Sequence, residues 1–354
     1  MNIDLDKVHK DKQPQSTKKS RYFILVVIIF LLIFLSRVLY LGADQGSFVE
    51  IESSHGGYNA RNKVWLGHWP LYMNWYQPMG YMPVQNFLSY LSFRFFGVGT
   101  VQFRFPCVLV TFVGLIFFYL ALLKQTNRSF ALLGLSLYAL NYSVTNWNRS
   151  SLTENFYLFF MPVAIWFLVK DRLSGKDIFF FTLFSALNVV TKVDGYPFCL
   201  AAVVFLIIRS LKVKSFSKTI LQIFLGSLGA LAILLFLFAF TNSFRYIVPL
   251  YSFYRTLLIS ELSLLQRIIP TFKVLIETLI RVDPYILLAF LISIPILVME
   301  RRRLNRTDWF MVIFFLITLA TRLIIPPAYF SFKRVIFLIF RSLFFLWKNE
   351  KIKW

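Results

Sequence analysis

The sequence predicts an all-helical integral membrane protein, and three observations carry this prediction. Hydrophobic residues make up 58% of the 354-residue chain, aromatic residues make up 19%, and the mean hydropathy is +0.66. Apolar runs near the ~20 residues that a bilayer-spanning helix needs recur along the whole length. Lysines and arginines fall in short clusters between these runs, as in the cytoplasmic loops of membrane proteins. This composition excludes a soluble globular fold.

The apolar runs predict a bundle of about ten transmembrane helices. They cover residues 22–40, 104–123, 129–146, 153–169, 178–191, 196–208, 219–241, 284–299, 308–325 and 334–347. The fifth and sixth runs are short, so they fit either one long segment or two re-entrant ones. The first run is too long for the core of a signal peptide and lacks a small-residue cleavage site, which indicates a retained anchor.

The basic clusters predict the orientation of the chain in a cell membrane. With residues 1–21 as a cytoplasmic tail, every compact cluster lies on the cytoplasmic side. These clusters are 124–128, 170–176, 209–218, 301–306 and the tail 348–354. The net charge of +22 therefore marks membrane topology and not nucleic-acid binding. Residues 22–347 form one membrane domain with its active face outside, and its long external loops are 41–103 and 242–283.

The first external loop concentrates acidic, basic and aromatic side chains, which indicates chemistry at the outer surface. Within it, Val84–Phe95 has apolar residues at helical spacing, and Gln85, Asn86, Ser89, Ser92 and Arg94 lie on the opposite face. This pattern predicts an amphipathic helix lying in the membrane interface. The stretch Ile259–Ile280 has a similar pattern, interrupted at Pro270.

Asp44 is the candidate catalytic residue, because a carboxylate directly after a membrane span is normally paired or functional. It can act as a base on an attacking hydroxyl or amine. A plain helix-end residue, or a partner of Arg37, is the structural alternative. Arg104, at the start of the second span, is suited to bind a phosphate leaving group, or it extends to the lipid headgroups.

Two external turns hold further candidates. Lys192 and Asp194 form one turn, where the lysine either binds a lipid-linked phosphate or is neutralised by Asp194. Arg149 and Glu154 form the other, and Glu154 equally fits the first turn of a helix capped by Ser151 or Thr153. Cys107 and Cys199 lie inside spans and indicate neither a disulfide nor a metal site.

The order of these motifs resembles the polyprenyl-phosphate-dependent glycosyltransferases of the GT-C fold. The closest resemblance is to the dolichyl-phosphate-mannose protein mannosyltransferases and the bacterial aminoarabinose transferases, glycosyltransferase family 39-like proteins. The motifs are Asp44, Tyr58–Ala60, Gly67, Tyr81–Pro83, Arg104–Pro106, Asn148–Glu154, Thr191–Lys192 and Tyr329–Phe330 with Arg334. Two departures stand out: Gln45 follows Asp44 where the family usually has a second acid, and single prolines at 78 and 83 replace a Pro-Pro pair.

This resemblance implies an enzyme that transfers a sugar from a polyprenyl-phosphate donor to an acceptor outside the cytoplasm, with inversion. The acceptor is a protein, lipid A or a glycan. Asp44 would be the catalytic acidic residue and act as a base, Arg104 and Lys192 would hold the donor phosphate, and Arg61, Arg149, Glu154, Asp194 and Arg334 would support them. No cofactor is expected, and dependence on a divalent metal is left open. The alternatives are a transporter or flippase of lipid-linked sugars and a degenerate, non-catalytic relative.

Overall fold

A computed structural model describes the helical bundle of the N-terminal two thirds of the chain. The described residues are 14–39, 41–43, 57–69, 83–140, 142–151, 154–170, 173–191, 195–212, 215–242, 244, 308–310, 312–314 and 316–317. All regular secondary structure within these ranges is helical. The predicted spans 284–299 and 334–347, most of the span 308–325 and most of the loop 242–283 lie outside them.

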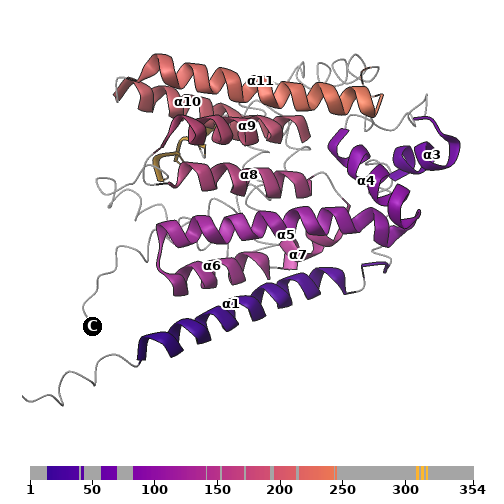
Figure 1. Ribbon diagram of the computed structural model, residues 1–354, viewed down its shortest axis with the longest axis horizontal. Helices are drawn as coiled ribbons and strands as arrows, with labels where there is room; N and C mark the ends of the chain where they lie inside the picture. The colour runs from indigo at the N-terminus through magenta and orange to yellow at the C-terminus, as the bar shows by residue number, and fades with distance from the viewer. Residues whose placement is uncertain are drawn as a thin grey trace, which may run out of the picture.

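The helices lie side by side, with α1 at one edge, α5 and α6 in the middle and α8 to α11 beyond them (Figure 1). Their bounds are α1 Pro14–Val38, α3 Tyr58–Leu66, α4 Pro83–Phe96, α5 Thr100–Gln125, α6 Arg128–Ala139, α7 Tyr142–Arg149, α8 Glu154–Leu168, α9 Gly175–Thr191, α10 Tyr196–Lys212 and α11 Phe216–Phe240. Among the described residues, α5 (26 residues) and α11 (25 residues) are each long and apolar enough to cross a membrane.

Hydrogen bonds at both ends of α1 fix its direction relative to α5. The Tyr22 hydroxyl lies 2.8 Å from the Tyr119 hydroxyl and donates to the Arg128 carbonyl at 2.7 Å. At the other end, Arg104 of α5 donates to the Leu41 carbonyl just beyond α1. The first half of α1 therefore lies beside the last part of α5, and the two helices are antiparallel.

The two ends of the bundle differ in composition. We call one the basic end, because Lys124, Arg128, Lys170, Arg209 and Lys218 lie there, close to the short connections α5–α6, α8–α9 and α10–α11. We call the other the loop end, because α3 and α4 lie there (Figure 1). The cations of these three connections thus lie together at one end, whereas Arg61, Lys63 and Arg94 of α3 and α4 lie at the other.

Local sequence explains how α6 and α9 begin at the basic end. The Asn127 side chain accepts a hydrogen bond from the Phe130 N–H at 3.0 Å and caps α6. Ser174 and Asp177 bond each other's backbone N–H at the start of α9, which is a capping box. Burial raises the pKa of Asp177, but hydrogen bonds from Lys170 and Ser174 outweigh it and hold this pKa below its usual value.

Two glycines allow the helices of the core to approach closely. A Cβ at Gly114 of α5 would lie 2.7 Å from the Leu158 carbonyl oxygen of α8, and one at Gly226 of α11 would lie 2.7 Å from the Phe179 carbonyl oxygen of α9. Small residues at crossing points are how membrane helices pack in the absence of a hydrophobic drive. The α5–α8 and α9–α11 pairs are among the most extensive helix contacts described, and Phe310 packs on α9 and α10.

The predicted third span is broken, and the prediction of one continuous helix over 129–146 is wrong. α6 ends at Ala139 and α7 begins at Tyr142. The Ala139 carbonyl accepts hydrogen bonds from the Arg37 guanidinium at 2.6 Å and the Thr145 hydroxyl at 3.0 Å. These side chains satisfy a carbonyl that a continuing helix would have bonded. The fifth and sixth runs are two separate helices, α9 and α10.

Candidate functional site

Arg104 lies at the start of α5 and is fully buried at the loop end. Its Nη1 donates to the Leu41 carbonyl and to the Ala43 carbonyl, each at 2.8 Å. The Ala43 carbonyl belongs to the peptide group that joins Ala43 to Asp44. The alternative that Arg104 extends to the headgroups is therefore wrong: its charge is inside the protein and holds the segment that leads into Asp44.

Arg37 is a second fully buried arginine near the same end. Its Nε and Nη2 bond the Asn148 Oδ1 at 3.1 and 3.0 Å, and Nη2 also bonds the Ala139 carbonyl. Its Nη1 donates to the Ile33 carbonyl of α1 at 2.9 Å. Charges inside a membrane bundle need such partners, and these bonds tie α1 to α6 and α7.

The polar contacts continue from Asn148 into the turn between α7 and α8. The Asn148 Nδ2 donates to the Asn155 Oδ1 at 3.2 Å, and the Asn155 Nδ2 donates to the Ser150 carbonyl at 2.5 Å. All three residues are buried. The predicted Asn148–Glu154 motif is thus partly structural, because its first residue and Asn155 just beyond it hold the turn in place. Arg149 ends α7 with a half-buried side chain, and Glu154 begins α8.

The polar face of α4 completes the buried polar layer of the loop end. The Gln85 Nε2 donates to the Ser151 hydroxyl at 2.5 Å, and the Cys107 thiol donates to the Gln85 Oε1 at 3.5 Å. The Ser151 hydroxyl also donates to the Phe103 carbonyl at 3.0 Å. Asn86 and Ser89 of α4 are buried as well.

The helix predicted over Val84–Phe95 is confirmed as α4, but its polar face points in another direction than expected. An amphipathic helix that lies in the interface has its polar face toward water, and on this helix that face holds Gln85, Asn86, Ser89 and Ser92. These four side chains are buried in the protein, whereas Phe95 is 73% exposed and Phe96 is 69% exposed. Beside a membrane, polar groups are satisfied inside the protein. The position of Arg94, exposed at the end of α4, is as predicted.

α3 is a helix that the sequence analysis did not predict within the first external loop. Tyr58, Arg61 and Trp65 recur at helical spacing, and the Arg61 guanidinium lies 4.9 Å from the Tyr58 ring centroid and 5.1 Å from that of Trp65. Such cation–π contacts stabilise an exposed helix face. Gly67 ends the helix with φ at +75°, which glycine adopts without strain.

The other predicted site residues fall at or beyond the limits of the described residues. Asp44, Lys192, Asp194 and Arg334 lie outside them, as does the side chain of Glu154. The described residues bring Arg104 and the α7–α8 turn together at the loop end, where α9 also ends and α10 begins (Figure 1). Within the described ranges, no group of His, Cys, Asp and Glu side chains is arranged to hold a metal ion.

Sequence reasoning named Arg37, Gln85 and Asn148, but it did not identify them, or Asn155, as the buried residues that build this layer. The burial of Arg37 could have been predicted, because an arginine inside an apolar span must find partners in the protein. Asn188 of α9 gives a similar signal: it is fully buried near the α10 junction, and its Oδ1 has no partner among the described residues.

Comparison with known proteins supports the family indicated by the motifs. The sequence profile described as dolichyl-phosphate-mannose-protein mannosyltransferase matches residues 77–240. No curated protein and no solved structure matches the chain. The matched region contains Arg104, Arg149, Glu154, Lys192 and Asp194. It starts after Asp44 and Arg61 and ends before Arg334, and it covers the described helices from α4 to α11.

Residues 77–240 thus match the dolichyl-phosphate-mannose-protein mannosyltransferase family, and this match supports a membrane glycosyltransferase of the GT-C type.

Proposed function

We propose that this protein transfers a sugar from a polyprenyl-phosphate donor to an acceptor outside the cytoplasm, with inversion at the anomeric carbon. The family match supports a lipid-linked donor within a membrane. One observation of the structure carries the proposal: the buried Arg104 holds the Leu41 and Ala43 carbonyls, directly before the proposed base Asp44. A scaffold of this kind is what a catalytic group needs for reproducible positioning.

In the proposed reaction, the Asp44 carboxylate accepts the proton of an acceptor hydroxyl or amine. The acceptor atom forms its new bond to the anomeric carbon from the face opposite the phosphate. The bond between that carbon and the phosphate oxygen breaks, and polyprenyl phosphate departs with the electron pair. Positive charge develops on the sugar and negative charge on the phosphate, so Lys192 and Arg104 are assigned to stabilise the leaving group.

Arg104 is given two roles in this proposal. Its hydrogen bonds to two backbone carbonyls make it a positioning residue for the segment before Asp44. Its role as a phosphate ligand stays a prediction from the sequence, as do the supporting roles of Arg61, Arg149, Glu154, Asp194 and Arg334. The contacts of Arg61 with two aromatic rings of α3 support a role in ordering the first external loop.

We place the basic end in the cytoplasm and the loop end outside, with residues 22–347 as one membrane domain. The cations of the short connections α5–α6, α8–α9 and α10–α11 lie at the basic end, which supports this orientation. A lipid donor fits it, because a prenyl chain presents its sugar outside the cytoplasm, where nucleotide sugars are absent. A donor lipid also reaches the loop end from within the bilayer.

The test is a transfer assay on the purified full chain reconstituted in sealed liposomes. The chain is incubated with a polyprenyl-phosphate hexose and with membrane and periplasmic extracts as acceptor sources. Mass spectrometry is expected to detect loss of the donor, release of polyprenyl phosphate and a matching mass increase in an acceptor. Donor that binds and crosses the bilayer chemically unchanged would identify a transporter. Donor that binds without either outcome, in every extract, would identify a non-catalytic relative.

A further inference from the structure

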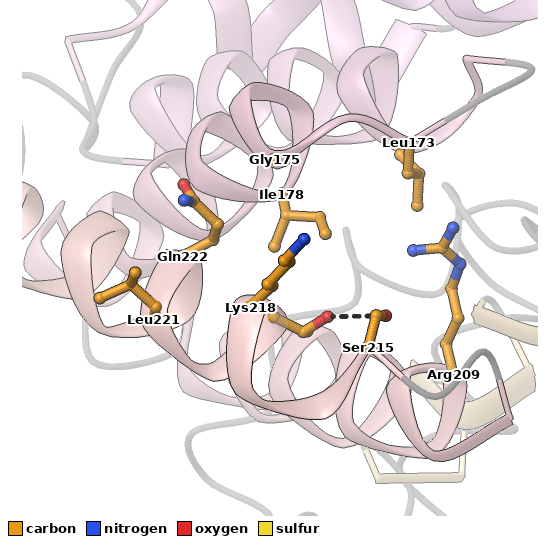
Figure 2. A pocket seen from close by; sticks show the side chains of 9 residues that line it. Leu173, Gly175, Ile178, Arg209, Ser215, Lys218, Leu221 and Gln222 are labelled. Atoms are coloured by element: carbon orange, nitrogen blue, oxygen red, sulfur yellow. Dashed lines mark hydrogen bonds between the residues drawn. The ribbon is translucent and has the colours of Figure 1, made fainter.

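A pocket of about 360 Å³ lies at the basic end, where α9 begins, α10 ends and α11 begins. Its size is within the ~300–1,000 Å³ typical of small-ligand sites. Figure 2 shows it between Gly175 and Ile178 of α9, Arg209 of α10, and Ser215 and Lys218 at the start of α11. It is at the opposite end of the bundle from Arg104 and from the site proposed for sugar transfer.

Among the described residues that line this pocket, both charged groups are positive. The Arg209 guanidinium and the Lys218 ammonium extend into it from two different helices (Figure 2). None of the nine lining residues is acidic. Asp177, the acid in the first turn of α9, does not line the pocket, and it is engaged by Lys170 and Ser174.

The backbone at the start of α11 adds positive potential to the two cations. Ser215 is the first residue before the helix, and its side chain makes no capping hydrogen bond. Its hydroxyl lies 3.5 Å from the Thr219 hydroxyl inside the pocket (Figure 2). The first N–H groups of a helix have no partner within the helix and attract anions. The hydroxyl and amide groups of Ser215, Thr219 and Gln222 supply further hydrogen bonds.

An apolar strip runs from the pocket along the outer face of α11. Leu221 lines the pocket and is 53% exposed, and Phe224 and Leu228 follow at helical spacing with 61% and 48% exposure. In a membrane protein such a face contacts lipid chains. A ligand with an anionic head and apolar tails would therefore contact both the pocket and the strip.

We propose that this pocket binds the anionic phosphodiester headgroup of a membrane phospholipid, held by Arg209 and Lys218, with the acyl chains along Leu221, Phe224 and Leu228. Basic pockets between membrane helices bind anionic headgroups in this way. The site is separate from donor binding and does not depend on the proposed glycosyl transfer. A soluble phosphate ester presents the same charged group, so the test distinguishes the two sources.

The test titrates phosphatidylglycerol, and separately the zwitterionic phosphatidylcholine, into the detergent-purified full chain, and counts bound lipids by native mass spectrometry. The variants are Lys218→Gln and Arg209→Gln. The matched control is Lys124→Gln, which removes an exposed cation of the same end that does not line the pocket. Arg209→Lys keeps the charge, and it is the second variant should Arg209→Gln fail to fold.

Lys218→Gln and Arg209→Gln are each expected to weaken phosphatidylglycerol binding about five-fold, the effect of one basic residue near an anionic lipid surface. Lys124→Gln is expected to leave phosphatidylglycerol binding unchanged. Phosphatidylcholine is expected to bind more weakly than phosphatidylglycerol to the native chain and to every variant. Equal losses in all three variants would show diffuse attraction and overturn the proposal, as would no loss in either pocket variant. Inorganic phosphate that displaces the lipid and depends on the same two residues would overturn the lipid as the source.

Discussion

The hydrogen bonds of Arg104 allow a quantitative prediction about the loop end. We consider Arg104→Met, which keeps an unbranched, flexible side chain but removes every side-chain N–H donor. The Leu41 and Ala43 carbonyls would lose their bonds to Nη1, each 2.8 Å long in the structure. Leu41 is itself buried, so its carbonyl has little access to water as a replacement partner.

The expected cost is about 3 kcal/mol. A hydrogen bond to a charged group contributes roughly 1.5–3 kcal/mol, and polar bonds between membrane helices fall at or below the lower limit. Two bonds of about 1.5 kcal/mol each give the estimate. Because about 1.4 kcal/mol corresponds to a factor of ten, the population in which the loop end is open is expected to rise roughly hundred-fold.

Cys107 provides the assay, because it is fully buried one turn after Arg104 in α5. In a chain whose other cysteine, Cys199, is replaced by serine, a thiol-reactive dye reports how often the loop end opens. Labelling of Cys107 is expected to be roughly hundred-fold faster in Arg104→Met. The control is Arg94→Met, because Arg94 is exposed at the end of α4. Labelling of Arg104→Met at the original rate, or equal acceleration by Arg94→Met, would refute this reasoning.

Two other predictions concern stability. Gly226→Ala is expected to destabilise the bundle by about 1–3 kcal/mol, because the new Cβ would lie 2.7 Å from the Phe179 carbonyl oxygen; Gly229→Ala on the same helix is the control, since its nearest contact is a movable side chain at 3.3 Å. Equal thermal unfolding of the two variants would contradict the close α9–α11 packing. Asp177→Asn is expected to cost about 1 kcal/mol at neutral pH. Because the pKa of Asp177 is lowered by folding, the advantage of the native chain is present above the ordinary carboxyl pKa and is lost as the pH falls through the folded-state pKa. The free energies of unfolding of the native chain and of Asp177→Asn are measured in detergent across acidic pH. A difference between them that does not change with pH would contradict this prediction.

The sequence predicted the helices well where apolar runs are bounded by charge. Six predicted spans correspond to α1, α5, α8, α9, α10 and α11 within about four residues, except that α1 begins at Pro14 and not at residue 22. The basic clusters between them predicted which helix ends lie together. The predicted count of about ten spans stays a prediction, because the last three fall mostly outside the described residues.

The sequence predicted less well where long-range polar contacts decide the structure. The end of α6 at Ala139 depends on Arg37, about a hundred positions away, and no local pattern contains that contact. The inward orientation of α4 depends on a partner for Gln85 in the α7–α8 turn. An amphipathic pattern alone fits a polar face toward water or toward the protein, so only the tertiary structure distinguishes them.

Long-range contacts are also the reason why the candidate site could be predicted only in part. Arg104 was identified correctly as a residue of the loop end, but its contact with the segment before Asp44 was not foreseen. The two buried arginines hold α1 and its end in place: Arg37 bonds α6 and α7, and Arg104 bonds the Leu41 and Ala43 carbonyls just beyond α1. Catalytic roles for Asp44 and Lys192 stay predictions that rest on the motifs and the family.

The most direct test of the proposed function is a comparison of donor binding and turnover in Asp44→Asn. The substitution keeps the size of the side chain and removes the carboxylate that is proposed to accept the acceptor proton. General-base catalysis contributes about 10²–10⁴-fold, so release of polyprenyl phosphate is expected to fall by at least about a hundred-fold while binding of the polyprenyl-phosphate hexose is retained. Glu50→Gln, which removes another carboxylate of the same loop, is expected to keep its activity. Full turnover by Asp44→Asn, with normal donor binding, would contradict the account.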